Sequence, residues 1–236
     1  MQRNVRRNDK NRGIMLPEDV SEDLAYLCGI FAGDGSINYR RKKNEYSLKV
    51  VGNPKDEKEF YHKIIIPKFE RIFGISPRIK YHDCQTTYGF SVYSKTIYTY
   101  LTKVIILPSG IKYPELRVPE IFSKDQKFTI AFIRGVFDTD GCVSFKRKYR
   151  SYPYYPTISL ASKSPKFIKQ IFDALVSLNL KPTVIYNRKV RDWRIKNQFT
   201  IISRIDLNGK NNLKKWIENV GFFNPKHLNK IKTFAD

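Results

Sequence analysis

The sequence predicts a mixed α/β (α+β) protein made of two similar halves, each with the element order α-β-β-α-β-β-α. One observation is an apolar stretch of about three helical turns that ends in Asp-Gly and occurs at residues 24–37 and again at 129–143. Another is a set of landmarks that recur 105 to 111 positions apart, namely Asp34/Asp140, Pro54/Pro165 and Pro77/Pro182. Because these landmarks are unrelated in type, their common offset indicates an internal repeat.

The composition indicates a folded, intracellular protein that binds a polyanion. Lysine and arginine total 44 against 22 acidic residues, a net charge of +22, and 16 Phe and 15 Tyr argue against a disordered basic chain. Such an excess favours nucleic acid over a membrane as the partner. The 3 cysteines form no CxxC pair, which excludes a disulfide framework and a cysteine-based zinc site. No stretch has the pattern of a signal peptide or a membrane span, so we expect the protein to stay in the cytoplasm or an organelle and not to be secreted.

The first half is expected at residues 17–107, after a basic arm at 1–16 that either contacts phosphates or is a solvated tail. Acidic residues after Pro17 suit the positive end of the first apolar helix. Asn53 followed by proline is typical of a helix start, and Gly74 of a helix end. The predicted elements are strands 36–43 and 45–51, a helix from 54 to about 73, strands 77–83 and 88–93, and a short helix 94–104.

The second half is expected at residues 123–236, after an extended, proline-marked connector at 108–122. Ser123-Lys-Asp-Gln126 has the pattern of a capping box at the start of the second apolar helix. Ser164 followed by proline again predicts a helix start. The remaining predicted elements are strands 142–150, 157–162, 182–190 and 199–207, and a helix at 210–219.

The two apolar helices are expected to pack against each other and to bring two aspartates together. Small residues lie four apart in both copies, as Gly29 and Gly33, and as Gly135 and Thr139, and this spacing allows close helix approach. The helix ends would then place Asp34 beside Asp140. Two carboxylates about 4 Å apart repel by roughly 4 kcal/mol at an effective dielectric near 20, so a cation is expected between them, and oxygen ligands suit Mg²⁺.

A surface Asp-Gly turn is the alternative interpretation of either copy taken alone. The occurrence of two copies favours the paired site.

The nonapeptides Leu27-Cys-Gly-Ile-Phe-Ala-Gly-Asp-Gly35 and Ile133-Arg-Gly-Val-Phe-Asp-Thr-Asp-Gly141 resemble the two motifs of a LAGLIDADG homing endonuclease in its single-chain form. The resemblance covers residues 20 to 235. It implies that the motif helices form the interface between pseudo-symmetric halves, and that antiparallel sheets form a DNA-binding saddle. It also implies a monomer that acts on double-stranded DNA. The first motif departs from the family pattern at Ala32, where the family name has Asp.

The resemblance also implies a catalytic centre. Asp34 and Asp140 match the last acidic residues of the motifs, which bind the catalytic metal, with Gly33 and Thr139 beside them as further metal ligands. Mg²⁺ would be the metal, Mn²⁺ would substitute, and Ca²⁺ would bind without supporting cleavage. The family adds a basic residue from outside the motifs: Lys226 matches it in the second half, and Arg117 or Lys112 in the first. The position after the second strand, often Gln in the family, falls near Gly52 and Ser162 here.

Basic and aromatic residues on the predicted hairpins suit contacts with DNA, because a two-stranded ribbon fits the major groove. A solvated hairpin tip is the alternative for any single basic run, but such runs occur on corresponding hairpins of both halves. The expected DNA-binding residues are Tyr39, Arg40, Arg41, Lys42, Lys43, Lys49, Arg78, Lys80, Gln85, Lys146, Arg147, Lys148, Arg150, Arg188, Lys189, Arg191, Trp193, Arg194, Lys196 and Gln198. Since the halves differ in these side chains, the target should be long and asymmetric.

Several other functions remain as alternatives. The segment around Asp138 and Asp140 also resembles the DxDG motif of haloacid-dehalogenase-like phosphatases, but that interpretation leaves the repeat and the charge unexplained. An RNA maturase or a non-cleaving DNA-binding protein could use the same fold. We expect a free-standing, intron-encoded, site-specific endonuclease rather than an intein, because neither end carries splice-junction residues.

Overall fold

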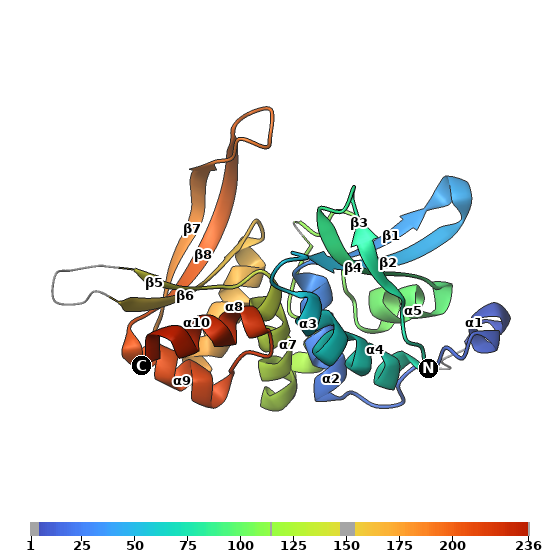
Figure 1. The fold of residues 1–236 in the computed structure, drawn as a ribbon, viewed down its shortest axis with the longest axis horizontal. Helices are drawn as coiled ribbons and strands as arrows, with labels where there is room; N and C mark the ends of the chain where they lie inside the picture. The colour runs from blue at the N-terminus through green and yellow to red at the C-terminus, as the bar shows by residue number, and fades with distance from the viewer. Residues whose placement is uncertain (1–4, 114, 147–153, 236) are drawn as a thin grey trace.

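Two four-stranded antiparallel sheets stand next to each other above a layer of helices (Figure 1). The computed structural model describes residues 5–113, 115–146 and 154–235. The first sheet has the order β1-β2-β4-β3 and the second the order β5-β6-β8-β7, so both halves have one topology. The strands are β1 Gly35–Arg40, β2 Glu45–Gly52, β3 Ile79–His82, β4 Thr87–Tyr93, β5 Cys142–Lys146, β6 Tyr155–Ser162, β7 Pro182–Arg191 and β8 Phe199–Asn208.

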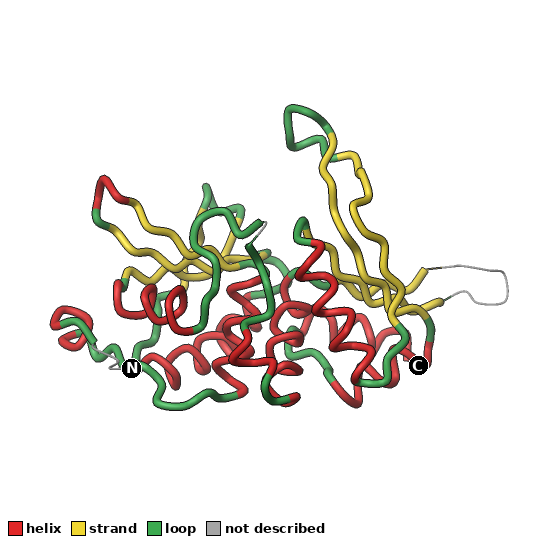
Figure 2. The backbone as a smooth tube through the Cα atoms, turned by 180° about the vertical axis from the view of Figure 1, so that it is seen from behind, coloured by secondary structure: helices red, strands yellow, loops and turns green. Residues whose placement is uncertain are grey.

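The helices lie mainly on one side of the sheets (Figure 2). They are α1 Arg7–Asn11, α2 Glu22–Ala32, α3 Lys58–Phe60, α4 Ile66–Phe73, α5 Lys95–Thr99, α6 Glu120–Ser123, α7 Gln126–Thr139, α8 Pro165–Ser177, α9 Lys210–Asn219 and α10 Pro225–Ala235, with π-helical turns at Tyr61–Ile65 and Tyr100–Val104. Alternate strand residues such as Leu48, Phe90, Ile158 and Ile205 are fully buried against this layer. The opposite faces of both sheets are therefore free of the core. Of the helices described, none is long and apolar enough to cross a membrane.

Helices α2 and α7 are in backbone contact at the centre of the molecule (Figure 1). A Cβ atom built on Gly29 would lie 2.2 Å from the Phe132 carbonyl oxygen, and one on Gly135 would lie 2.3 Å from the Tyr26 carbonyl oxygen. Only glycine permits so close an approach at these two positions. The close packing of the two motif helices, predicted from the small residues, is confirmed.

The N-terminal segment differs from the expected arm. The carboxylate of Asp9 accepts hydrogen bonds from the Ser94 hydroxyl and the Thr96 backbone N–H, both at 3.0 Å. Ile14 is 2% exposed, and the Met15 N–H donates to the Phe73 carbonyl at 2.9 Å. Residues 5–16 are therefore not a solvated tail, because one acidic and one apolar side chain anchor them to the first half. Contact of their exposed basic side chains with phosphates stays a prediction.

The helix predicted from Pro54 begins four residues later, at Lys58. Asn53 makes a local turn instead, accepting from the Lys55 N–H at 2.9 Å. The π-helical turn ends at Ile65, two residues before Pro67, which has no N–H to donate to the preceding turn. The predicted box at Ser123 also differs: the cap of α7 is Asp125, which accepts from the Lys127 N–H at 3.0 Å.

Helix α10 is absent from the predicted elements. This helix begins at Pro225, directly after Asn224. A capping residue followed by proline also predicts the helix start at Ser164. The described part of β5 ends at Lys146, so the rest of the strand predicted to residue 150 lies outside the described residues. Strands β7 and β8 extend beyond the helix layer as a long hairpin (Figure 1).

Candidate active site and nucleic-acid interface

The ends of α2 and α7 bring Asp34 and Asp140 together, as the motif pattern predicts. Both helices end with an ordinary i to i−4 backbone hydrogen bond. The Gly33 N–H donates to the Gly29 carbonyl at 3.0 Å, and the Asp140 N–H donates to the Val136 carbonyl at 2.9 Å. A Cβ atom on Gly33 would lie 3.6 Å from Cγ of Asp140. The two carboxylates are therefore neighbours at the junction of the halves, where both sheets begin.

The site destabilises negative charge on both aspartates. Partial burial raises the pKa of Asp34 to about 7, and repulsion from Asp140 and then Glu57 adds to the rise. Loss of hydration among the surrounding protein atoms also raises the pKa of Asp140, although part of this residue is exposed to solvent. Lys112 and Lys226 oppose both shifts. A site that resists two carboxylate charges is one that a bound cation would stabilise.

Lys112 is the basic residue that the first half places at the site. Its Nζ donates to the carbonyl oxygens of Ala32, at 3.0 Å, and Gly33. Burial lowers the pKa of Lys112, and the charges of Asp140 and Asp34 counteract that fall. Arg117, the other candidate, is half exposed, and its guanidinium lies 3.7 Å from Glu115. The structure therefore places Lys112, and not Arg117, beside the aspartates.

Lys226 reaches the site from the second half and forms an ion pair with Glu57 of the first half, 2.8 Å from Nζ to Oε1. Glu57 is 4% exposed. The Asn224 side chain also donates to Glu57, at 3.0 Å. Glu57 was missed by the sequence reasoning, because 169 positions separate it from Lys226 and no local pattern connects the two.

Asp138 fixes the segment that carries Lys226. Its carboxylate is fully buried and accepts from the Tyr26 hydroxyl at 2.6 Å and from the N–H groups of Phe223 and Asn224 at 3.1 Å. Burial raises the pKa of Asp138 to about 6, and these hydrogen bonds hold it lower than burial alone would. An enclosed carboxylate of this kind is unsuited to nucleophilic attack, so the phosphatase alternative loses its nucleophile.

The other expected metal ligands, Gly33 and Thr139, take part in hydrogen bonds within the protein. The Thr139 hydroxyl donates into its own helix, to the Gly135 and Val136 carbonyls at 3.0 Å, and it lies against Gly33, where a Cβ atom would be 2.0 Å from its Oγ1. The Gly33 carbonyl already accepts from Lys112. In the described part of the chain, no group of three or more His, Cys, Asp or Glu side chains could hold a metal ion. The site thus brings together two aspartate carboxylates, those of Asp34 and Asp140.

The exposed sheet faces form the candidate nucleic-acid interface. In the first sheet, residues opposite the core include Asn38, Arg40, Lys49 and Lys80, since their strand neighbours Ile37, Leu48 and Val50 are buried. Arg40 pairs with Glu45 at 3.3 Å and Lys49 with Asp83 at 2.9 Å, both near solvent. Surface pairs of this kind contribute little, so these cations remain available to phosphates.

Tyr39 differs from the expectation. It pairs with Tyr46 across the strands, on the face of Ile37 and Leu48, and the two rings stack at 4.4 Å. Its ring therefore packs on the helix side of the sheet and not on the open face. The other predicted residues of this half are exposed in turns or loops, as Arg41, Lys42, Lys43, Arg78 and Gln85.

The second sheet presents a different set of side chains. Arg188 lies opposite Ile202 and shares the open face with Arg204 and Asp206, which form an ion pair at 2.8 Å that the sequence reasoning missed. Lys189 and Arg191 point to the opposite face, where Lys189 lies over the Phe199 ring at 4.4 Å. A β-bulge between Ile185 and Arg188 shifts the alternation of β7, so simple alternation along the sequence would have assigned these residues to the wrong faces.

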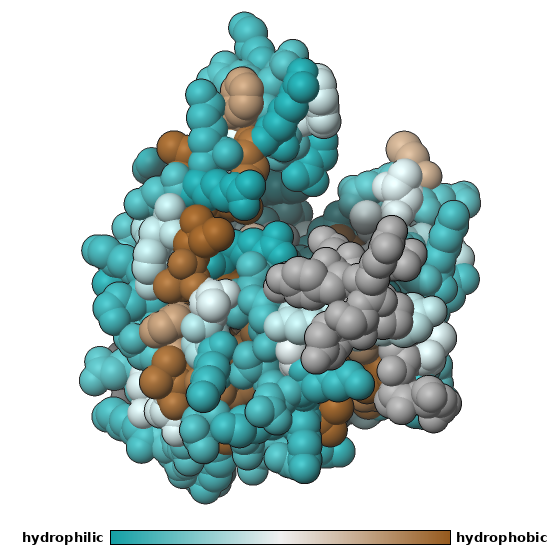
Figure 3. Space-filling view, turned by 90° about the vertical axis from the view of Figure 1, so that its left-hand side faces the viewer, coloured by the Kyte–Doolittle hydropathy of each residue, from teal (hydrophilic) through white to brown (hydrophobic). Residues whose placement is uncertain are grey.

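The β7–β8 hairpin tip carries the remaining predicted residues. Arg191 lies 3.4 Å from the centre of the Trp193 ring, and Arg194 donates to Asp192 at 2.9 Å. The predicted residues exposed here are Arg188, Lys189, Arg191, Trp193, Arg194, Lys196 and Gln198. The space-filling view shows a hollow beside the tallest projection of the molecule (Figure 3). The surface of this projection is mainly hydrophilic. Arg147, Lys148 and Arg150 lie outside the described residues, and so does the side chain of Lys146.

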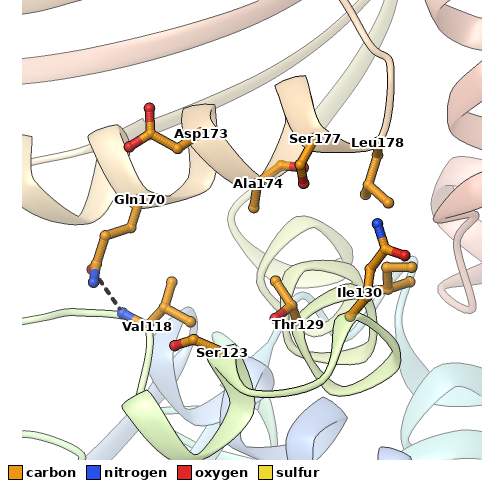
Figure 4. A pocket seen from close by; sticks show the side chains of 10 residues that line it. Val118, Ser123, Thr129, Ile130, Gln170, Asp173, Ala174, Ser177 and Leu178 are labelled. Atoms are coloured by element: carbon orange, nitrogen blue, oxygen red, sulfur yellow. Dashed lines mark hydrogen bonds between the residues drawn. The ribbon is translucent and has the colours of Figure 1, made fainter.

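A separate pocket of about 420 Å³ lies between the start of α7 and α8 (Figure 4). Gln170 accepts from the Val118 N–H there at 3.0 Å. Thr129 lines it, eleven residues before Asp140, and a helix rises about 1.5 Å per residue. This pocket is therefore remote from the aspartates, and its one acidic residue, Asp173, pairs with Lys169 at 2.8 Å. It is not part of the candidate site.

Comparison with known proteins identifies the architecture. Residues 127–221 match the model of the LAGLIDADG-like domain. An uncharacterized protein of Methanocaldococcus jannaschii is 25% identical over 140 residues, 58% of this chain and 45% of that protein. The alpha subunit of ribonucleoside-diphosphate reductase NrdEB of Bacillus subtilis is 26% identical over 174 residues, 71% of this chain and 15% of the subunit. The chain thus spans less than half the length of either relative.

Solved structures extend the likeness to the whole chain. The structure of I-DmoI in complex with DNA and Ca has a TM-score of 0.60 at 17% identity, covering 92% of this chain and 100% of that one. The homing endonuclease I-WcaI, bound to its DNA recognition sequence, has a TM-score of 0.57 at 12% identity, covering 88% and 84%. Such identities establish a common fold. The chain is therefore a double-motif protein with the LAGLIDADG homing endonuclease fold, and its second half contains the matched LAGLIDADG-like domain.

Proposed function

We propose that this protein is a site-specific DNA endonuclease of the homing type, which hydrolyses one phosphodiester on each strand of a long, asymmetric duplex. The observation that carries the proposal is the pair Asp34 and Asp140, held at the ends of two contacting helices where both sheets begin. One acidic residue comes from each half, and each half has its own open sheet face. This arrangement suits two phosphates, one on each strand of a single duplex.

The aspartates fit a divalent cation, and Mg²⁺ suits them best. Mg²⁺ is usually bound by one or two carboxylates together with substrate phosphates and waters, so a third acidic residue is not needed. The pKa of Asp34 is raised to about 7 by burial first and by repulsion from Asp140 second, and a bound cation would favour the ionised pair. A bound metal would supply activated water and stabilise the leaving oxygen. The backbone carbonyls of Gly33 and Thr139 lie next in the chain as further oxygen donors. Mn²⁺ should substitute, whereas Ca²⁺ should bind without cleavage.

The protein's own groups orient and stabilise the reacting phosphates. Lys112 and Lys226 present ammonium groups close to the aspartates, where they would stabilise charge that develops on phosphate oxygens. The open sheet faces, with Lys49 and Lys80 in one half and Arg188 and Arg204 in the other, would hold the duplex across the aspartates. Because both faces belong to one chain, a monomer suffices for an asymmetric target.

The similar structures support duplex DNA as the partner, since I-DmoI was solved in complex with DNA and I-WcaI bound to its DNA recognition sequence. The test is selection of cleaved sites from a random duplex library in Mg²⁺. We expect one long asymmetric sequence to be enriched, with both strands cut, and no cleavage in EDTA or with Asp34→Asn. Enrichment of a bound sequence that is never cleaved would instead indicate a DNA-binding protein, or an RNA maturase if RNA competes better than duplex DNA.

A further inference from the structure

The two lysines at the site have different partners. Lys112 donates to two neutral carbonyl oxygens at the end of its own motif helix, those of Ala32 and Gly33. Lys226 instead donates to a carboxylate, Glu57 Oε1, at 2.8 Å, and this carboxylate belongs to the other half. The side chain of Glu57 is 5% exposed and that of Lys226 is 24% exposed. The pair is thus shielded from water, which strengthens the interaction.

Glu57 is held firmly in this position. Its Oε2 accepts from the Asn53 N–H at 2.7 Å, and its Oε1 accepts from the Asn224 side chain at 3.0 Å. A Cβ atom on Gly52 would lie 2.1 Å from Glu57 Oε2. The carboxylate therefore fills the space at the end of β2 that a side chain at position 52 would take. No equivalent acidic residue contacts Lys112 among the described residues.

This difference makes the two halves electrostatically unequal. An ammonium paired with a carboxylate presents a much smaller net charge to a phosphate than one paired with carbonyl dipoles. Lys226 would have to leave or share Glu57 to stabilise charge on a phosphate, whereas Lys112 donates to neutral carbonyl oxygens and has no such carboxylate bond to break. Because Lys226 and Lys112 present different net charges, the two strands are expected to be cleaved at different rates.

We propose that Glu57 is a positioning residue that holds and partly neutralises Lys226, so that the strand position served by Lys226 is cut after the one served by Lys112. This inference rests on the proposed endonuclease function. It assigns to Glu57 no contact with DNA, and it requires only that Glu57 acts through Lys226. Its consequence is a nicked duplex that accumulates before the double-strand break.

The first experiment tests the ion pair without DNA or metal. The protein is acetylated with a small amine-directed reagent, and labelling of each lysine is followed by mass spectrometry. We expect Lys226 to react several-fold faster in Glu57→Gln than in the wild type, because its amine loses a carboxylate partner. Glu59→Gln is the matched control: it removes an exposed acid of the same segment that pairs with Lys63. Equal reactivity of Lys226 in all three proteins would overturn the proposal.

The second experiment measures each strand. A selected target carries different labels on its two strands, and single-turnover cleavage is resolved on denaturing gels. Removing one charge-stabilising donor costs about 100-fold or more, so partial neutralisation should make the strands differ roughly tenfold in rate. Lys226→Met should slow the slower strand further, and Lys112→Met should slow the faster one. Glu57→Gln should accelerate the slower strand until the two rates agree within about twofold.

The outcomes distinguish a failure of the role assigned to Glu57 from a failure of the endonuclease function. Equal strand rates in the wild type, or a rate ratio that Glu57→Gln changes no more than Glu59→Gln does, would overturn the role of Glu57 while leaving the nuclease intact. Slower cleavage of the Lys226 strand in Glu57→Gln would also overturn it, because Glu57 would then assist Lys226 rather than neutralise it. If neither strand is cut by the wild type, the endonuclease function itself fails, and the labelling result alone decides whether Glu57 restrains Lys226.

Discussion

Gly29 and Gly135 meet across the centre of the molecule, so that a Cβ atom on Gly29 would lie 3.1 Å from the Cα of Gly135. This contact sets the distance between the motif helices, and through it the distance between Asp34 and Asp140. The stability of the helix pair and the spacing of the two aspartates therefore depend on glycine at both positions.

Gly29→Ala should destabilise the protein by more than the ~1–3 kcal/mol typical of overpacking, because the new methyl meets a backbone carbonyl at 2.2 Å. Gly29→Leu should be worse. Gly110→Ala is the comparison: its Cβ meets nothing within 4 Å, and only its φ of +77° is unfavourable. Thermal unfolding measures both. If the melting temperature of Gly29→Ala is no lower than that of Gly110→Ala, the space between α2 and α7 must be large enough for a methyl group.

Asp34→Asn and Asp140→Asn should each suppress cleavage of both strands, since each removes one of the two carboxylates available to the metal. Binding of the target in EDTA should survive or tighten, because a negative charge near the phosphates is lost. Strand-resolved cleavage and gel-shift assays provide the two measurements. Full double-strand cleavage by Asp34→Asn would refute the assignment, and activity that depends on Asp140 but not on Asp34 would revive a phosphatase-like reaction.

The contribution of Asp34 to the stability of the metal-free protein should be lost as the pH rises from about 4 to about 7. The pKa of Asp34 is raised in the folded state to about 7, so folding favours the protonated form, and this stability is lost as Asp34 ionises. At pH 8, Asp34→Asn should therefore melt at a higher temperature than the wild type, and its free energy of unfolding should be larger by at most about 4 kcal/mol. Near pH 3.5 the two proteins should melt at the same temperature. The buried His227, whose pKa is lowered to about 3, affects both proteins alike and cancels in the comparison.

Affinity for duplex DNA should fall steeply with salt, with a slope of about −0.9 in log K against log salt for each neutralised phosphate. Arg188→Ala, on the open face of the second sheet, should lower that slope by about 1 if Arg188 contacts a phosphate. Lys169→Ala is the control, because Lys169 lies on helix α8 and pairs with Asp173. Titrations between 50 and 200 mM salt that show no slope would remove nucleic acid as the main partner.

Tyr26→Phe should cost about 1.5–3 kcal/mol, the range for a hydrogen bond to a charged group, because Asp138 loses a donor at 2.6 Å inside the core. Asp138→Asn should be at least as costly, since two backbone N–H groups also depend on its carboxylate. The double variant should be less destabilised than the sum of the two changes. Tyr98→Phe, whose hydroxyl bonds to Ser109 near the surface, should change little. Additive losses at Tyr26 and Asp138 would argue against their coupling.

Much of the fold and the centre of the site could be predicted, because their signals are local. The Asp-Gly helix ends, the small residues four apart and the repeated spacing are all visible within short stretches, and they predict the meeting of Asp34 and Asp140. The side of the sheet on which Tyr39 lies also follows from strand alternation, once a buried neighbour is known. The side on which Lys189 lies does not, because a β-bulge between Ile185 and Arg188 shifts the alternation of β7. Helix α10 was equally readable from Asn224-Pro225.

The remainder depends on contacts between distant segments. Glu57 meets Lys226 only because the two halves are docked, and Asp138 captures Phe223 and Asn224 only because the C-terminal segment folds back over α7. Arg117 and Lys112 are both basic residues of one connector, and their sequence contexts do not tell which side chain turns inward. Burial and ion pairing decide that, and both are properties of the packed molecule.

The shared strand order of the two sheets has a consequence for how such proteins can diversify. Each half has its own sheet and its own supporting helices, and the halves touch mainly through α2 and α7. A half taken from a different member of the fold could be recombined with this one, provided that it keeps glycine at the helix crossing and a partner for Lys226. Under the proposed function, new recognition sequences would then arise by exchange of whole halves, while the paired aspartates stay at the junction.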